Sequence, residues 1–162
     1  LQQINAIIFL NYKPIHSTDD WCLTDDDNLQ EFLDAVNQIK DCKIGFDSCM
    51  ISYLTIVEPK LISETVEFCE AARFSAFIAE DSFMYPCSFM HDTEWYGIDL
   101  TKMTLQEAWQ TGELFLKMRN ALQTPGKQEY PINDCGECNQ YPFCHGGCQI
   151  FNINKCRKGK ER

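Results

Sequence analysis

Five of the ten cysteines in this 162-residue chain gather near its C-terminal end, and their spacing constrains the local fold more than any other feature. They follow the pattern C-x2-C-x5-C-x3-C-x7-C, from Cys135 to Cys156. The two residues between Cys135 and Cys138 form a tight turn, so both sulfurs can reach one metal centre. Gly146 and Gly147 allow a sharp change of chain direction at little conformational cost. Such a segment needs something to close around: an iron–sulfur cluster, zinc or disulfide bonds.

The overall composition helps to choose among these three. The net charge of −10 argues against nucleic acid and against anionic membrane surfaces as partners. No apolar run approaches the roughly 20 residues of a membrane span, and no signal peptide is recognisable. We therefore expect a cytoplasmic protein that uses its cysteines for metal rather than for disulfide bonds.

Residues 1–56 show the pattern of an α/β fold. Residues 4–10 are apolar on both faces, as in a strand of a parallel sheet that is covered on both sides. Residues 26–40 carry apolar side chains at helical spacing, and residues 43–47 indicate a second strand. Together they predict one β-α-β unit. This unit cannot cover its own faces, so either the rest of the chain completes it or it is the last portion of a larger α/β barrel.

Residues 57–134 predict a mixture of helices and short antiparallel strands. Aromatic residues alternate with smaller ones on both sides of Glu80-Asp81-Ser82, which is typical of a β-hairpin. Thr104 has the position of a helix cap. The expected elements, in chain order, are a helix at 63–72, hairpin strands at 74–79 and 83–89, a third strand at 95–100, helices at 105–110 and 113–122, and a linker at 123–134.

The other cysteines extend the metal prediction to a second site. A site held only by thiolates uses four cysteines, so the five near the C-terminal end exceed one site by one. The extra cysteine is left to join partners earlier in the chain. The five C-terminal cysteines and three upstream cysteines make eight, which is enough for two four-cysteine sites. The upstream candidates are Cys22, Cys42, Cys49, Cys69 and Cys87.

With these residues the chain resembles the C-terminal SPASM extension of radical S-adenosylmethionine enzymes. That family carries C-x2-C-x5-C-x3-C, a gap and a final cysteine, and all five positions match here in spacing. It also carries an upstream hairpin, C-x(9–15)-G-x4-C, which Cys69 and Cys87 match with Ser82 in place of the glycine. The resemblance covers roughly residues 45–156.

The resemblance implies two auxiliary [4Fe–4S] clusters. No cysteine lies between Cys69 and Cys87, so a complete ligand set for the nearer cluster needs an earlier cysteine. Cys49 is our choice over Cys42 and Cys22, because it follows the strand expected at 43–47; in some relatives that iron is instead open to substrate. The implied ligands are Cys49, Cys69, Cys87 and Cys148 for the nearer cluster, and Cys135, Cys138, Cys144 and Cys156 for the distal cluster.

The family's defining motif, C-x3-C-x2-C, is missing from this sequence. That motif holds the cluster that cleaves S-adenosylmethionine, so this chain alone is not expected to start radical chemistry. We therefore expect the C-terminal part of a longer enzyme, whose remaining part supplies S-adenosylmethionine and a third [4Fe–4S] cluster. Residues 1–56 are then the last strands of a partial (β/α)6 barrel. Residues 57–162 form the SPASM domain, with a hairpin and helices at 57–122, a linker at 123–134 and the cysteine-rich metal-bound segment at 135–156.

The implied function is that of a maturase that modifies a peptide or protein. Its auxiliary clusters would bind substrate or pass electrons, with a donor such as flavodoxin or ferredoxin. Two alternatives remain: a stand-alone iron–sulfur electron-transfer module, and a zinc-stabilised interaction domain, since thiolates bind both metals.

No catalytic residue can be assigned from the sequence. In sulfatase-maturating relatives an aspartate base follows the second hairpin cysteine, and Ser88 has that position here. Lys13 and Asp47 end the barrel-like strands, where active-site residues gather in such folds, but a surface pair is an equal alternative. His145 stands beside Cys144, either as a hydrogen-bond partner of a cluster sulfur or as an exposed loop residue. Asp81, Tyr85, His91 and Asp92 are further acid–base candidates without an assigned role.

Overall fold

The computed structural model describes residues 4–15, 28–57, 66–129 and 135–154. Cys22 and Cys156 lie outside these ranges, as do the predicted start of the helix at 63–72 and the end of the linker at 123–134. Within the described residues, no helix combines the length and the apolar character needed to cross a bilayer.

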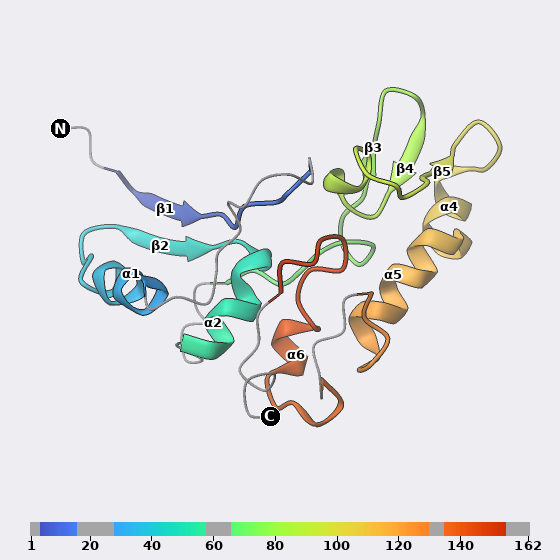
Figure 1. Cartoon of the computed structure of the whole chain (residues 1–162). Coiled ribbons are helices and arrows are strands. Elements are labelled where there is room, and N and C mark those ends of the chain that lie inside the picture. The colour runs from blue at the N-terminus through green and yellow to red at the C-terminus, as the bar shows by residue number, and fades with distance from the viewer. Residues whose placement is uncertain (1–3, 16–27, 58–65, 130–134, 155–162) are drawn as a thin grey trace.

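The N-terminal unit consists of two parallel strands and a helix (Figure 1). Strand β1 (Ala6–Phe9) pairs in parallel with β2 (Lys43–Phe46), and helix α1 (Asn28–Asn37) connects them in sequence. The ring of Phe9 contacts those of Phe32 and Phe46, with centroids 4.9 and 5.6 Å apart, so α1 packs on one face of the sheet. The predicted β-α-β unit is thus confirmed, with shorter elements.

The other face of β1 is not covered by the described residues. Ile4, Ile8 and Leu10 remain 62, 65 and 71% exposed. Parallel strands are normally covered on both faces, so this apolar face is incomplete as a core. The described residues form no closed barrel, and the partial barrel stays a prediction.

A short helical segment follows β2 directly. It comprises the 3-10 helix η1 (Ser48–Met50) and helix α2 (Ile51–Val57). The Asp47 carboxylate caps η1 by accepting hydrogen bonds from the backbone N–H groups of Cys49 and Met50, at 2.8 and 3.1 Å. The buried hydroxyl of Tyr53 donates to the carbonyl oxygen of Ile153 at 2.8 Å. This contact attaches the N-terminal unit to the end of the described chain.

The helix predicted over residues 63–72 is wrong for its described part. Val66 forms a parallel bridge with Phe46, at the end of β2. The carbonyl oxygen of Glu70 accepts from three later backbone N–H groups in a turn, and Ala72 has a positive φ of 59°. Pairing with the sheet and this turn therefore use the backbone groups that a helix would need, and tertiary contacts override helical propensity.

Three short antiparallel strands follow, in the order β3-β4-β5. The hairpin and the third strand are thereby confirmed, again shorter than predicted. Ser82 adopts a positive φ of 67° in the hairpin turn, at the position where a glycine was expected. The 3-10 helix η3 (Ser88–Met90) comes directly after Cys87. The strands are β3 (Phe77–Ile78), β4 (Phe83–Tyr85) and β5 (Ile98–Asp99).

Helices α4 (Leu105–Thr111) and α5 (Glu113–Gln123) confirm the predicted pair. Thr104 and Glu107 form a complete capping box at the start of α4. The guanidinium of Arg119 donates to the carbonyl oxygens of Trp109 and Ala72, at 2.6 and 2.7 Å. Arg119 thus fastens α5 both to α4 and to the turn before the hairpin.

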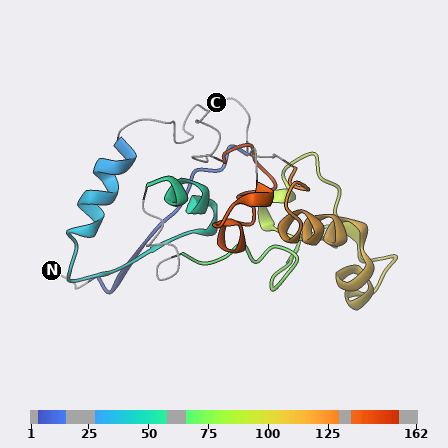
Figure 2. The ribbon, with the colours of Figure 1, turned by 90° about the horizontal axis from the view of Figure 1, so that it is seen from below.

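The C-terminal segment, residues 135–154, lies between the N-terminal unit and α5 (Figures 1 and 2). Its only regular elements are the 3-10 helix η4 (Cys135–Glu137) and helix α6 (Tyr141–Cys144). The described part of the predicted linker is held to the end of α5 by hydrogen bonds. The Gln128 side chain donates to the carbonyl oxygens of Ala121 and Thr124, at 2.8 and 3.0 Å, and is buried.

Candidate metal centre

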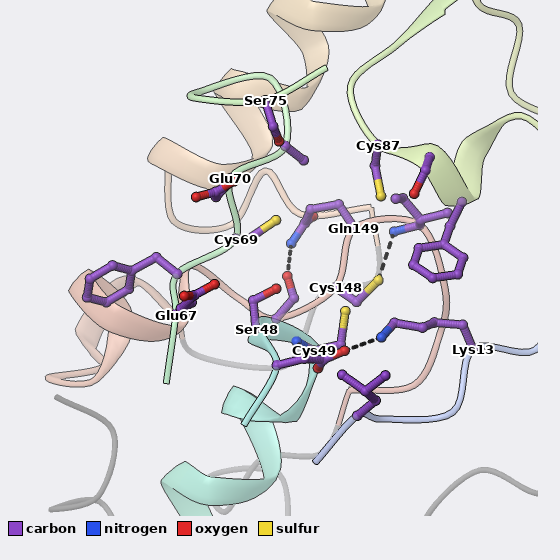
Figure 3. A pocket seen from close by; sticks show the side chains of 18 of the residues that line it. Lys13, Ser48, Cys49, Glu67, Cys69, Glu70, Ser75, Cys87, Cys148 and Gln149 are labelled. Carbon is purple, nitrogen blue, oxygen red and sulfur yellow. Dashed lines mark hydrogen bonds and ion pairs between the residues drawn. The ribbon is translucent and has the colours of Figure 1, made fainter. Parts of the chain in front are cut away.

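A pocket of about 700 Å³ lies where the N-terminal unit, the hairpin and the C-terminal segment meet (Figure 3). Four cysteines from four separate parts of the chain line it, and Figure 3 shows their sulfur atoms facing a common space. Cys49 lies on η1, Cys69 on the extended segment before the hairpin, Cys87 after β4, and Cys148 in the loop after α6. These are the four residues predicted to hold the nearer cluster.

Cys49 and Cys148 interact directly with each other. A hydrogen bond between their side chains, reinforced by burial, raises the pKa of Cys49, and the same hydrogen bond lowers the pKa of Cys148. The backbone N–H of Ile150 also points to the Cys148 sulfur, at 3.5 Å. Cys148 is therefore the thiol of this pair that ionises first.

Cys69 and Cys87 complete the group. Burial raises the pKa of Cys69 to about 11 and also raises the pKa of Cys87. The charge of Cys49 acts on both thiols and raises both pKa values further. Ionisation of Cys49, Cys69 and Cys87 is therefore costly, and a bound metal or cluster would relieve that cost by taking them as thiolates.

The donor set and the space fit a cluster. Iron–sulfur clusters are held by cysteine thiolates, and a pocket of about 700 Å³ has room for a group much larger than one ion. Among the residues that the structure describes, no group of three or more histidine, cysteine, aspartate or glutamate side chains is arranged to hold a metal ion, and this includes the four pocket cysteines.

Lys13 and Asp47 form an ion pair at the wall of the pocket, which both residues line. Their side chains are only 9 and 16% exposed. The Lys13 ammonium also lies over the ring of Phe89, 5.1 Å from its centroid. The sequence left open whether these residues form an active-site pair or a surface pair, and the structure places them beside the thiols.

The backbone of Cys148 is fixed by a side chain that sequence reasoning did not identify. The Asn154 side chain accepts from the N–H of Cys148 at 2.6 Å and donates to its carbonyl oxygen at 2.7 Å. His145, Gly146 and Gly147 all have positive φ, and this run turns the chain between Cys144 and Cys148. An added Cβ on Gly147 would lie 2.2 Å from Asn154 Oδ1, so both the turn and the close approach require glycine there.

The three described cysteines predicted for the distal cluster lie outside the pocket lining: Cys135 begins η4, Cys138 directly follows it, and Cys144 ends α6. The N–H of Cys138 donates to the carbonyl oxygen of Cys135 at 3.3 Å. Burial first, and then the charges of Cys135 and Cys144, raise the pKa of Tyr141. Two of the three thiols are thus near the same hydroxyl group. The fourth predicted ligand, Cys156, lies outside the described residues.

The other candidates occupy different places. His145 contacts Arg73, with its Nε2 atom 3.0 Å from the guanidinium. Burial lowers the pKa of His145. His91 pairs with Asp92 at 3.2 Å and with Asp81 at 3.8 Å, against the ring of Tyr85, and none of these four lines the pocket. Ser88 does line it. Cys42 is half-buried and lies outside the pocket lining.

Similarity to known proteins adds nothing to this description. Comparisons with protein-family models, with curated proteins and with solved structures each found no match to the chain. A function is therefore inferred from the cysteine spacing and from the geometry of the pocket.

Proposed function

We propose that this chain is the C-terminal part of a radical S-adenosylmethionine enzyme of the SPASM type, a maturase that modifies a peptide or protein. It binds two auxiliary [4Fe–4S] clusters, which bind substrate or transfer electrons. The observation that carries the proposal is the pocket lined by Cys49, Cys69, Cys87 and Cys148.

The position of Cys148 gives this observation its weight. Cys148 is only four positions from Cys144, yet it lines a pocket with cysteines that come from elsewhere in the chain. A free cysteine that merely fills a core is packed among apolar side chains. Here Cys148 belongs to the main core and the other three thiols pack against it, but all four also line one pocket and interact with one another. This arrangement supports a shared ligand more than it supports core packing.

The roles of the residues follow from their places. Cys49, Cys69, Cys87 and Cys148 would hold the nearer cluster, and Cys135, Cys138 and Cys144, together with Cys156, the distal one. When bound, such clusters supply one-electron redox couples. The pocket also has apolar lining residues, including Ile8, Phe77 and Phe89.

The partners follow from the same proposal. The substrate is a peptide or protein, and the electron donor is a flavodoxin or ferredoxin in the cytoplasm. S-adenosylmethionine and a third cluster belong to the rest of the enzyme. The absent C-x3-C-x2-C motif favours one second candidate, a stand-alone iron–sulfur electron-transfer module.

Metal and sulfide analysis of anaerobically prepared protein tests the proposal. We expect about eight iron and eight sulfide per chain, from two cubane clusters. The Cys42→Ala variant is a matched control, because Cys42 does not line the pocket, and it should keep the full content. About two zinc ions without sulfide would contradict the proposal and favour a zinc-stabilised interaction domain. The chain alone, when reduced, should not cleave S-adenosylmethionine, and cleavage would demand another initiating site.

A further inference from the structure

Cys49 is held more firmly than its place at the start of a short helix requires. The Asp47 carboxylate accepts from its backbone N–H at 2.8 Å. The side-chain amide of Asn11 donates to its carbonyl oxygen at 3.1 Å, and Asn11 is only 3% exposed. Both backbone polar groups of Cys49 are therefore bound by side chains, so its thiol has a defined direction into the pocket.

Lys13 completes this arrangement from the same stretch of chain as Asn11. It forms the ion pair with Asp47, lies over the ring of Phe89, and is almost fully buried. Figure 3 shows it reaching from the edge of the pocket toward Cys49. A buried lysine is costly unless something nearby compensates its charge. One carboxylate partner compensates it here, and a group of thiolates would do so as well.

Lys13 and Asp47 both line the pocket with the four thiols. The charge of Lys13 lowers the pKa values of both Cys49 and Cys87. The charge of Asp47 raises the pKa of Cys49. Lys13 is therefore a nearly buried cation at the wall of the four-cysteine pocket.

We propose that Asp47 and Lys13 are positioning residues of the nearer site: Asp47 fixes Cys49 as a ligand, and Lys13 raises the reduction potential of the cluster. The second part rests on the proposed function, because it needs a cluster held by the four pocket cysteines. A reduced cluster carries one more negative charge than the oxidised cluster, so a nearby buried cation stabilises the reduced form.

The test is a redox titration of the reconstituted full chain, followed by the electron paramagnetic resonance signals of its two clusters. In Lys13→Met the equilibrium constant for reduction of the nearer cluster should fall about tenfold. For a one-electron couple this lowers the reduction potential by about 59 mV. Lys13→Arg keeps the charge and should restore most of this loss. Asp47→Asn should shift the potential in the opposite direction, because it leaves the lysine unpaired. The distal cluster should keep its potential in all three variants.

Asp47 offers a separate test of position. Asparagine caps helices as well as aspartate does, so Asp47→Asn should keep the nearer cluster. Asp47→Ala removes the acceptor, and its iron content should fall from about eight toward about four. Lys102→Met is the matched control for Lys13→Met, because Lys102 pairs with Asp99 outside the pocket and its side chain is 80% exposed.

The outcomes separate the two proposals. Wild-type protein that binds no cluster would overturn the proposed function, and this inference with it. Two clusters with unchanged potentials in Lys13→Met and Asp47→Asn would overturn the role of Lys13 alone. Equal iron content in Asp47→Asn and Asp47→Ala would overturn the positioning role of Asp47.

Discussion

Helices α4 and α5 and the C-terminal segment lie side by side, but different interactions stabilise them. The helices have a complete capping box and bury Phe115 and Leu122 in the main core. The C-terminal segment buries Ile150, Phe151 and Ile153 in the same core but has little regular structure. Gln128 donates to the Tyr141 hydroxyl, and Asn154 holds the backbone of Cys148. The backbone hydrogen bonds of this segment form separate turns rather than one long helix or a sheet, so we expect a bound cluster to add more stability here than in the helices.

Removal of the clusters should therefore have the largest effect, and an unequal one. Exposure of the protein to air, followed by a chelator, should bleach its colour and lower its solubility. Hydrogen exchange at residues 135–154 should become much faster, because cluster binding is coupled to folding there. Amides of α5 should keep most of their protection. Equal loss of protection in both regions would contradict the difference that we draw between them.

Asn154→Ala should have the next largest effect. It removes both hydrogen bonds that fix the Cys148 backbone, and we expect a cost of about 2 kcal/mol in the free energy of unfolding. Iron content should also fall, because Cys148 loses its direction. Chemical denaturation with iron analysis measures both. Asn152→Ala changes an exposed neighbour and is the control; similar losses in the two variants would show that Asn154 has no special role.

Gly147→Ala should follow, at about 1–3 kcal/mol. Its φ of 78° is strained for alanine, and the new Cβ would meet the Asn154 side chain. Gly136→Ala is the matched control in the same segment, since no heavy atom lies within 4 Å of its added Cβ. Denaturation midpoints compare the two. A cost at Gly136 as large as that at Gly147 would contradict the described turn.

Thr104→Ala should have the smallest effect and should act on the helices alone. Loss of the cap should cost about 1 kcal/mol, with cluster content unchanged. Hydrogen bonds from Thr104 hold the pKa of Glu107 below its ordinary value of 4.5. The stability from Glu107 is therefore present above pH 4.5 and is lost as the pH falls through the lowered pKa. Stability curves of the wild type and the variant should converge toward low pH; a constant separation would exclude the capping box as the cause.

The same two regions show how far the sequence predicts the structure. The α4–α5 pair was predicted within one or two residues, because Thr104 and Gly112 mark helix boundaries locally. The β-α-β unit was predicted from an apolar run in its first strand and from the helical spacing of residues 26–40. The helix at 63–72 was predicted wrongly, because the pairing of Val66 with Phe46 is a tertiary contact that leaves no local signal.

The candidate site was predicted in part. Cysteine spacing and the family resemblance named Cys49, Cys69, Cys87 and Cys148, which the structure brings to one pocket, but their role as metal ligands stays a prediction. The supporting residues were not predicted. Asn11 bonds to the backbone of Cys49, and Asn154 bonds to the backbone of Cys148. Neither contact follows a helical or strand period, so the sequence pattern does not reveal it.

The central claim is that Cys144 and Cys148, four positions apart, serve different clusters. Electron paramagnetic resonance of reconstituted Cys144→Ala and Cys148→Ala protein tests it most directly. We predict that Cys148→Ala loses the same cluster signal as Cys87→Ala, and that Cys144→Ala loses the same signal as Cys135→Ala. If Cys144→Ala and Cys148→Ala instead lose the same signal, the two cysteines share one cluster and the four-cysteine pocket is not a separate site.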